Sequence, residues 1–179
     1  MLKFILIGLV VIVIAFVIVV SLRPTDFRVQ RSATIAAPPA AVFTHVNDVH
    51  KFQEWSPWAK VDPNSKIVFE GPEAGTGAKF SWAGNKDVGE GAMTVTDSKP
   101  AELVQFRLDF KKPFEATNTA DFSFKPEGDK TVVTWGMSGK NNFLFKAVGL
   151  FMDCDKMVGK DFEKGLDNLK TLAEAEAKK

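Results

Sequence analysis

The feature that most constrains this chain is an uncharged, almost wholly aliphatic run from Phe4 to Leu22. A helix over this run rises 1.5 Å per residue and reaches roughly 28 Å, which is close to the ~30 Å hydrocarbon thickness of a bilayer. A cleaved signal peptide usually has a shorter apolar core, of about 7–15 residues, followed by a site of small residues. The residues from Ser21 to Pro24 offer no such site. We therefore predict an uncleaved transmembrane anchor.

The anchor is expected to occupy residues 1–23 and to leave residues 24–179 as one domain, because this length supports one buried core and is too short for two ordinary domains. Lys3 precedes the apolar run and Arg23 follows it, so the positive charges at its two ends are nearly balanced. Since a short basic tail before a long apolar run usually stays in the cytoplasm, we expect the domain on the non-cytoplasmic face of the membrane.

Charge, cysteine and histidine content argue against several classes of partner. Lysine and arginine number 23 against 22 acidic residues, so the net charge of +1 gives no reason to expect nucleic acid. Cys154 is the only cysteine, which excludes an intramolecular disulfide and a multi-cysteine metal site. Because His45 and His50 are the only histidines, a zinc site is not expected either. We predict no metal ion and no cofactor.

Periodicity predicts an α+β domain that begins soon after the apolar run. Phe27, Val29 and Ile35 alternate with polar residues, as in a half-buried strand. Two short helices should follow Pro39, because apolar residues then recur at helical spacing. Between residues 65 and 137, runs of alternating apolar residues are separated by turn residues, which predicts an antiparallel meander with one apolar face.

After residue 142 the period returns to that of a helix. Phe143, Ala147 and Phe151 have the spacing of a short helix, and Asp153 can cap a longer one. The apolar stripe of the longer helix consists of Val158, Phe162, Leu166, Leu169 and Ala173. A curved antiparallel sheet wrapped around this C-terminal helix is the simplest way to bury both apolar faces.

Three glycines, Gly149, Gly159 and Gly165, fall in this C-terminal region. Each interior glycine disfavours a helix by roughly 1 kcal/mol relative to alanine, so something must require their small size. Close packing against the sheet is the ordinary explanation, and room for a ligand or a bend that opens a cavity is the functional one.

Four short segments have a recognisable place in this order of elements. They are Ala37-Pro38-Pro39-Ala40-Ala41-Val42-Phe43, Phe52-Gln53-Glu54-Trp55-Ser56-Pro57-Trp58, Gly75-Thr76-Gly77-Ala78 and Val88-Gly89-Glu90-Gly91-Ala92-Met93. With the lone C-terminal helix, they resemble the helix-grip fold of the START-like (SRPBCC) superfamily, and more narrowly its polyketide cyclase/dehydrase-like members. The resemblance implies a deep, mostly apolar cavity between sheet and helix, which relatives use for lipids, hormones, polyketides or aromatic substrates. It implies no shared set of catalytic residues, and we name none.

The aromatic composition makes an apolar cavity plausible without the resemblance. The chain has 16 Phe and 4 Trp but no Tyr, which suits a ligand held by shape and dispersion rather than by hydroxyl groups. Mid-strand positions on the apolar face, and the two tryptophans that flank Pro57, are the candidate cavity residues. They are Trp55, Trp58, Trp82, Met93, Phe106, Phe122, Trp135 and Met137. The alternative is that these rings fill a solid core.

Three functions are compatible with the sequence. The leading hypothesis is a membrane-tethered module that binds a hydrophobic or amphiphilic small molecule, such as a lipid or a polyketide-like aromatic. The second is an enzyme of the cyclase, dehydratase or hydrolase kind, with Glu90, Asp109 or His50 as acid or base. His50 and Glu54 could share one helical face, although a surface hydrogen bond is the simpler interpretation. The third is a tethered protein-interaction domain with a solid core.

Overall fold

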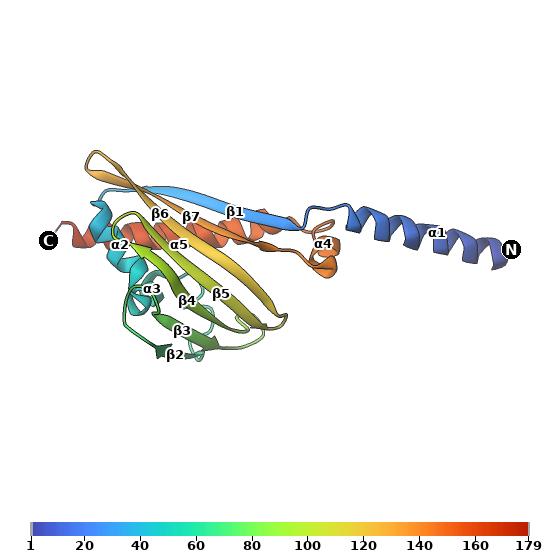
Figure 1. Ribbon diagram of the computed structural model, residues 1–179, viewed down its shortest axis with the longest axis horizontal. Helices are drawn as coiled ribbons and strands as arrows, with labels where there is room; N and C mark the ends of the chain where they lie inside the picture. Colours follow the sequence, from blue (N-terminus) through green and yellow to red (C-terminus); the bar gives the residue numbers. More distant parts are fainter. Residues whose placement is uncertain (1, 179) are drawn as a thin grey trace.

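In the computed structural model, which describes residues 2–178, a single long helix projects from the folded domain (Figure 1). This helix, α1 (Leu2–Ser21), is long and apolar enough to cross a membrane by length and composition. The side chains of residues 3–19 are exposed, and Val20 at the domain end is buried. The apolar surface of α1 therefore has almost no partner within the described chain.

The domain is built on one seven-stranded antiparallel sheet in the order β1-β7-β6-β5-β4-β3-β2. The strands are β1 (Asp26–Ile35), β2 (Lys66–Glu70), β3 (Lys79–Ala83), β4 (Glu90–Lys99), β5 (Leu103–Lys112), β6 (Ala116–Glu127) and β7 (Lys130–Lys140). Strands β2 to β7 form the expected meander, and β1 pairs with β7 to complete the sheet. The predicted strand content and its single apolar face are confirmed.

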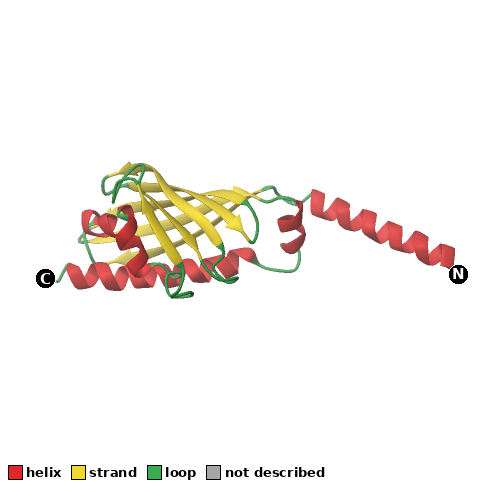
Figure 2. Cartoon of the chain, turned by 90° about the horizontal axis from the view of Figure 1, so that it is seen from below, coloured by secondary structure: helices red, strands yellow, loops and turns green. Residues whose placement is uncertain are grey.

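Three of the remaining helices lie at predicted places and a fourth is shorter than predicted. Helices α2 (Pro39–Asn47) and α3 (Val49–Trp55) follow β1, and α5 (Cys154–Glu176) lies along the concave side of the sheet (Figure 2). The carboxylate of Asp153 accepts a hydrogen bond from the Lys156 amide at 3.1 Å, so it caps α5 as expected. The chain has the helix-grip fold.

Helix α4 (Phe143–Val148) corrects one detail of the sequence interpretation. The spacing of Phe143, Ala147 and Phe151 suggested one helix through all three, but α4 ends at Val148 and Gly149 caps it. Phe151 therefore lies outside the helix, with 81% of its surface exposed. Gly149 is a helix end rather than a helix interior, so no packing argument is needed for it.

The core between sheet and helix is an aromatic stack. The Trp135 ring lies parallel to Phe162 of α5, at 4.1 Å between centroids and 7°, and it also stacks on Phe122 at 4.8 Å and 26°. Trp55 meets both Phe122 and Trp135 edge to face. Such offset and edge-to-face pairs are the favoured arrangements of aromatic rings.

The two interior glycines of α5 are explained by close packing, as the ordinary interpretation expected. A Cβ at Gly165 would lie 2.6 Å from the Trp135 ring and 3.1 Å from Pro57. At Gly159 it would collide with the guanidinium of Arg31. Arg31 donates from Nε to Glu163 at 2.9 Å and from Nη2 to Asp155 at 3.0 Å, which ties β1 to the first half of α5.

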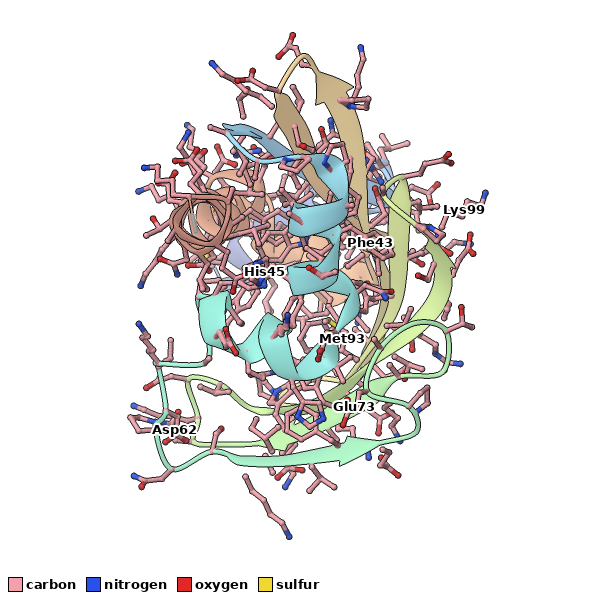
Figure 3. The ribbon with its side chains drawn as sticks, turned by 90° about the vertical axis from the view of Figure 1, so that its left-hand side faces the viewer. Phe43, His45, Asp62, Glu73, Met93 and Lys99 are labelled. Carbon is pink, nitrogen blue, oxygen red and sulfur yellow. The ribbon has the colours of Figure 1, made fainter. Side chains whose placement is uncertain are left out.

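The two ends of the domain differ in how fully they are packed. Figure 3 looks onto the end that carries α2 and α3, where side chains crowd the space between these helices, the sheet and α5. Phe43, His45 and Met93 are all buried there, with at most 8% of their surface exposed. The opposite end, beside α1 and α4, is open.

Candidate functional site

An apolar groove of about 890 Å³ lies at the α1 end of the domain. Its volume falls within the range of about 300–1,000 Å³ that is typical of small-molecule sites. The walls come from the start of β1, the end of β5, the start of β6, the end of β7, α4 and the start of α5. The apolar lining includes Phe27, Val29, Phe110, Phe114, Ala116, Met137, Phe145, Leu150, Phe151, Met157 and Val158.

On β6 the concave face loses its large side chains toward this end, which leaves room for the groove. The concave positions of β6 are, in chain order, Ala116, Asn118, Ala120 and Phe122, so the first large side chain on this face is that of Phe122. On the neighbouring strand, Met137 pairs with Ala120, whereas Trp135 pairs with Phe122. Small residues opposite a flexible methionine cannot fill the space that stacked rings fill elsewhere, so sheet and helix leave a gap.

Ion pairs fix the walls of the groove on two sides. The guanidinium of Arg28 donates to both carboxylate oxygens of Asp121, at 2.9 and 2.8 Å, and these hydrogen bonds raise the pKa of Arg28. The pKa of Arg31 is also raised, first by its hydrogen bonds to Asp155 and then by those to Glu163. These contacts hold β1 against β6 and α5.

The entrance of the groove carries cations that are available to a ligand. Lys140 and Lys146 line it and form no ion pair within residues 2–178. Arg23 lines it as well, and its Nη2 donates to the carbonyl of Gly149 at 2.9 Å. The pKa of Asp153 is lowered, chiefly by the hydrogen bond from the Lys156 amide, so this carboxylate is committed to capping α5. Asp26 also lines the groove and forms no ion pair within residues 2–178, so three unpaired cations accompany one unpaired carboxylate there. This excess of positive charge favours an anionic or polar group at the entrance and an apolar body within.

One of the eight candidate cavity residues lines this groove. That residue is Met137. The other seven do not belong to the groove walls; they are Trp55, Trp58, Trp82, Met93, Phe106, Phe122 and Trp135. Five of these seven are buried, Trp82 is partly buried, and Trp58 is exposed. All six aromatic members pack against other rings. This packing favours a core role for them, and contact between any of the seven and a ligand stays a prediction.

The groups weighed for acid–base chemistry do not converge on the groove. His50 stacks on Phe69 at 3.8 Å, and Glu54 is exposed. Glu90 pairs with Lys112 at 2.6 Å, and Asp109 pairs with Arg107 at 2.9 Å. None of the four lines the groove. In the part of the chain that the structure describes, no three His, Cys, Asp or Glu residues are placed to hold a metal ion.

Sequence reasoning missed most of the groove because its residues lie at element ends. Phe110 lies near the end of β5, Phe114 lies in the following turn, and Phe145 lies in a helix of six residues. Phe151 and Met157 provide the one sequence signal that could have indicated the groove. Phe151 is a large apolar residue in a connection, and Met157 is one on the polar face of α5, so neither is expected to pack in the core.

Solved structures that resemble the chain share its fold at low sequence identity. The protein MLL2253 from Mesorhizobium loti has a TM-score of 0.60 at 15% identity, covering 83% of this chain and 98% of that chain. The protein CV1439 from Chromobacterium violaceum has a TM-score of 0.59 at 15% identity, covering 85% and 99%. Aha1 from Colwellia psychrerythraea, whose structure is that of a dimer, also has a TM-score of 0.59 at 15% identity, covering 83% and 96%. At these identities the likeness shows the fold alone.

A sequence search against curated proteins found no match. The family described as polyketide cyclase/dehydrase and lipid transport matches residues 26–174. This range begins at the first residue of β1 and ends near the last turn of α5, so it takes in the entire sheet. The chain therefore belongs to the polyketide cyclase/dehydrase and lipid transport family, as the resemblance in its sequence predicts.

Proposed function

We propose that this protein is a membrane-tethered module that binds a hydrophobic or amphiphilic small molecule. Residues 1–23 serve as the anchor, and residues 24–179 form the binding domain. The observation that carries the proposal is the apolar groove of about 890 Å³, which opens at the end of the domain next to the exposed apolar helix α1. A ligand that partitions into lipid is encountered more often by a protein held at the bilayer.

Three features support a lipid-like ligand rather than a small polar substrate. The groove surface is mostly apolar, and phenylalanine, methionine and aliphatic side chains, which bind by shape and dispersion, supply much of it. Lys140, Lys146 and Arg23 stand at the entrance, where the head group of an amphiphile would lie. The family description includes lipid transport, and none of the four groups weighed above for acid–base chemistry lines the groove.

The tether predicts how the full-length protein behaves on extraction. We expect the intact chain to stay in the membrane pellet after alkaline carbonate and to need detergent, because the side chains of residues 3–19 have no burial site in the described domain. Mass spectrometry of the extracted protein should find the N-terminal segment present. Intact, uncleaved protein in the carbonate supernatant would refute the tether, and a shortened chain would identify α1 as a cleaved signal.

Ligand binding is tested most directly by filling the groove. Ala116 lines the groove, whereas Thr117, the next residue of β6, is exposed and faces the other side of the sheet. We expect Ala116→Trp to weaken lipid binding by about tenfold or more, equivalent to ~1.4 kcal/mol or more, while Thr117→Trp leaves binding unchanged. Native mass spectrometry of detergent-solubilised protein, incubated with a lipid extract, measures the retained molecules.

Two outcomes of that experiment contradict the proposal. If the folded wild-type protein retains no lipid or other apolar molecule, the groove is not a binding site for this class. If both tryptophan variants retain the ligand as the wild type does, the ligand lies elsewhere on the molecule. Circular dichroism and thermal melts confirm that each variant is folded before binding is compared.

A further inference from the structure

Large apolar side chains that face solvent lie on and beside the walls of the groove. Six of them are each about half or more exposed, and together we call them the apolar rim. The rim consists of Phe114 (52%), Phe143 (49%), Leu144 (50%), Phe151 (81%), Met152 (50%) and Met157 (52%). They come from the β5–β6 turn, α4, the connection from α4 into α5, and the first turn of α5, which holds Met157. A cluster of this kind, drawn from distant parts of the chain, marks an interaction surface rather than scattered exposure.

The apolar rim is held at the domain end of α1. Only Leu22 to Thr25 separate α1 from β1, so the connection spans at most about 18 Å when fully extended. Arg23 of this connection donates to the carbonyl of Gly149, directly after α4, and α1 contacts α4. Figures 1 and 2 both show α4 beside the last turn of α1, on the same end of the sheet.

We propose that the apolar rim is a membrane-contacting surface, which enters the interfacial layer of the bilayer that α1 spans and opens the groove directly to lipid. This inference rests on the proposed tether. When α1 spans a bilayer, its last turn lies at the membrane boundary, and the short connection keeps the rim within reach of the same boundary. Phe151 and Met152 would enter first, since they protrude from the connection rather than from a helix.

The charges beside the apolar rim fit a lipid surface better than they fit a protein cover. Arg23, Lys140 and Lys146 lie next to the rim without an ion-pair partner among the described residues. Long basic side chains around an apolar patch can reach lipid phosphates while their stems stay in apolar surroundings.

The single cysteine of the chain makes this surface straightforward to probe. In a Cys154→Ser background, Phe151→Cys places one thiol on the rim, and Asp129→Cys places one on the exposed β6–β7 turn at the far end of the domain (Figure 1). Both positions are exposed, so neither substitution removes packed atoms. Each full-length variant is labelled with an environment-sensitive fluorophore. It is then reconstituted into vesicles of phosphatidylcholine that contain about one fifth of the anionic lipid phosphatidylglycerol.

We expect nitroxide-bearing lipids to quench the label at residue 151 several-fold more strongly than the label at residue 129, and aqueous iodide to do the reverse. Vesicle flotation establishes independently that the chain is inserted. If the protein floats and iodide quenches both labels equally, the rim does not touch the bilayer and the inference is wrong. It is equally wrong if thiols at residue 151 of two copies cross-link efficiently in the vesicles, because a second copy then covers the rim.

The failures are distinguishable from one another. If the protein does not float with the vesicles, both the proposed tether and this inference are wrong. If the protein floats and retains lipid but the label at residue 151 stays in water, the proposed function holds. Only the proposal of a membrane-contacting rim is then wrong.

Discussion

Phe162→Asp is expected to prevent the domain from folding. Phe162 is 1% exposed, and its ring stacks on Trp135 at 4.1 Å, so the substitution removes the central ring contact between helix and sheet. It also places a carboxylate in the aromatic core, and burying a charge there costs several kcal/mol, which is comparable to the whole stability of a domain of this size.

Lys164→Asp is the matched control for this substitution. Lys164 lies two residues further along α5, on the exposed face, and forms no ion pair in residues 2–178. Its replacement should change the free energy of unfolding by no more than about 0.5 kcal/mol. Urea titrations followed by tryptophan fluorescence provide the comparison. Equal unfolding midpoints for the two variants would mean that the buried face of α5 is assigned incorrectly.

Trp135→Ala should destabilise the domain by about 3–5 kcal/mol, the full cost of removing a large core ring. Phe162 and Phe122 both stack on the Trp135 ring, and only 3% of its surface is exposed. At the wall of a cavity the loss would be smaller, because part of the ring would have no protein neighbour. The free energy of unfolding, measured in denaturant, distinguishes these cases.

Trp135→Phe is the conservative partner of that experiment. The indole nitrogen of Trp135 forms no hydrogen bond with the described residues, so phenylalanine keeps most of the stacking and removes no bond. Its cost should be about 1.5 kcal/mol or less, because phenylalanine leaves a much smaller cavity than alanine does. If Trp135→Ala also costs less than about 1.5 kcal/mol, the ring borders an empty space and the aromatic stack is not a solid core.

The fold could be predicted because its signals are local and repeated. Alternation on β7 places Val133, Trp135 and Met137 on one face without any knowledge of the neighbouring strands. The stripe from Phe162 to Ala173 likewise fixes which side of α5 is buried. Asp153 could be assigned as a cap from its place before that stripe. Each of these features depends on residues close together in the sequence.

The site could not be predicted because it depends on pairing between distant strands. The sequence assigns Ala120 and Phe122 to the same apolar face of β6 and gives no further distinction. Only the register between β6 and β7 shows that Met137 pairs with Ala120 and Trp135 with Phe122. Of the mid-strand positions predicted as cavity residues, Met137 lines the groove, and ligand contact at the others stays a prediction. Most of the groove walls come from strand ends and short connections, where the sequence has no regular period.

Photo-crosslinking tests the central claim, that this groove holds a ligand taken from the membrane. The full-length protein is reconstituted with a phospholipid that carries a diazirine on its acyl chain, irradiated and digested, and the modified residues are mapped by mass spectrometry. We predict adducts on α1 and also on groove peptides that contain Val29, Met137 and Phe145, the latter reduced by Ala116→Trp and unchanged by Thr117→Trp. Adducts confined to α1 in the folded wild-type protein would contradict the account.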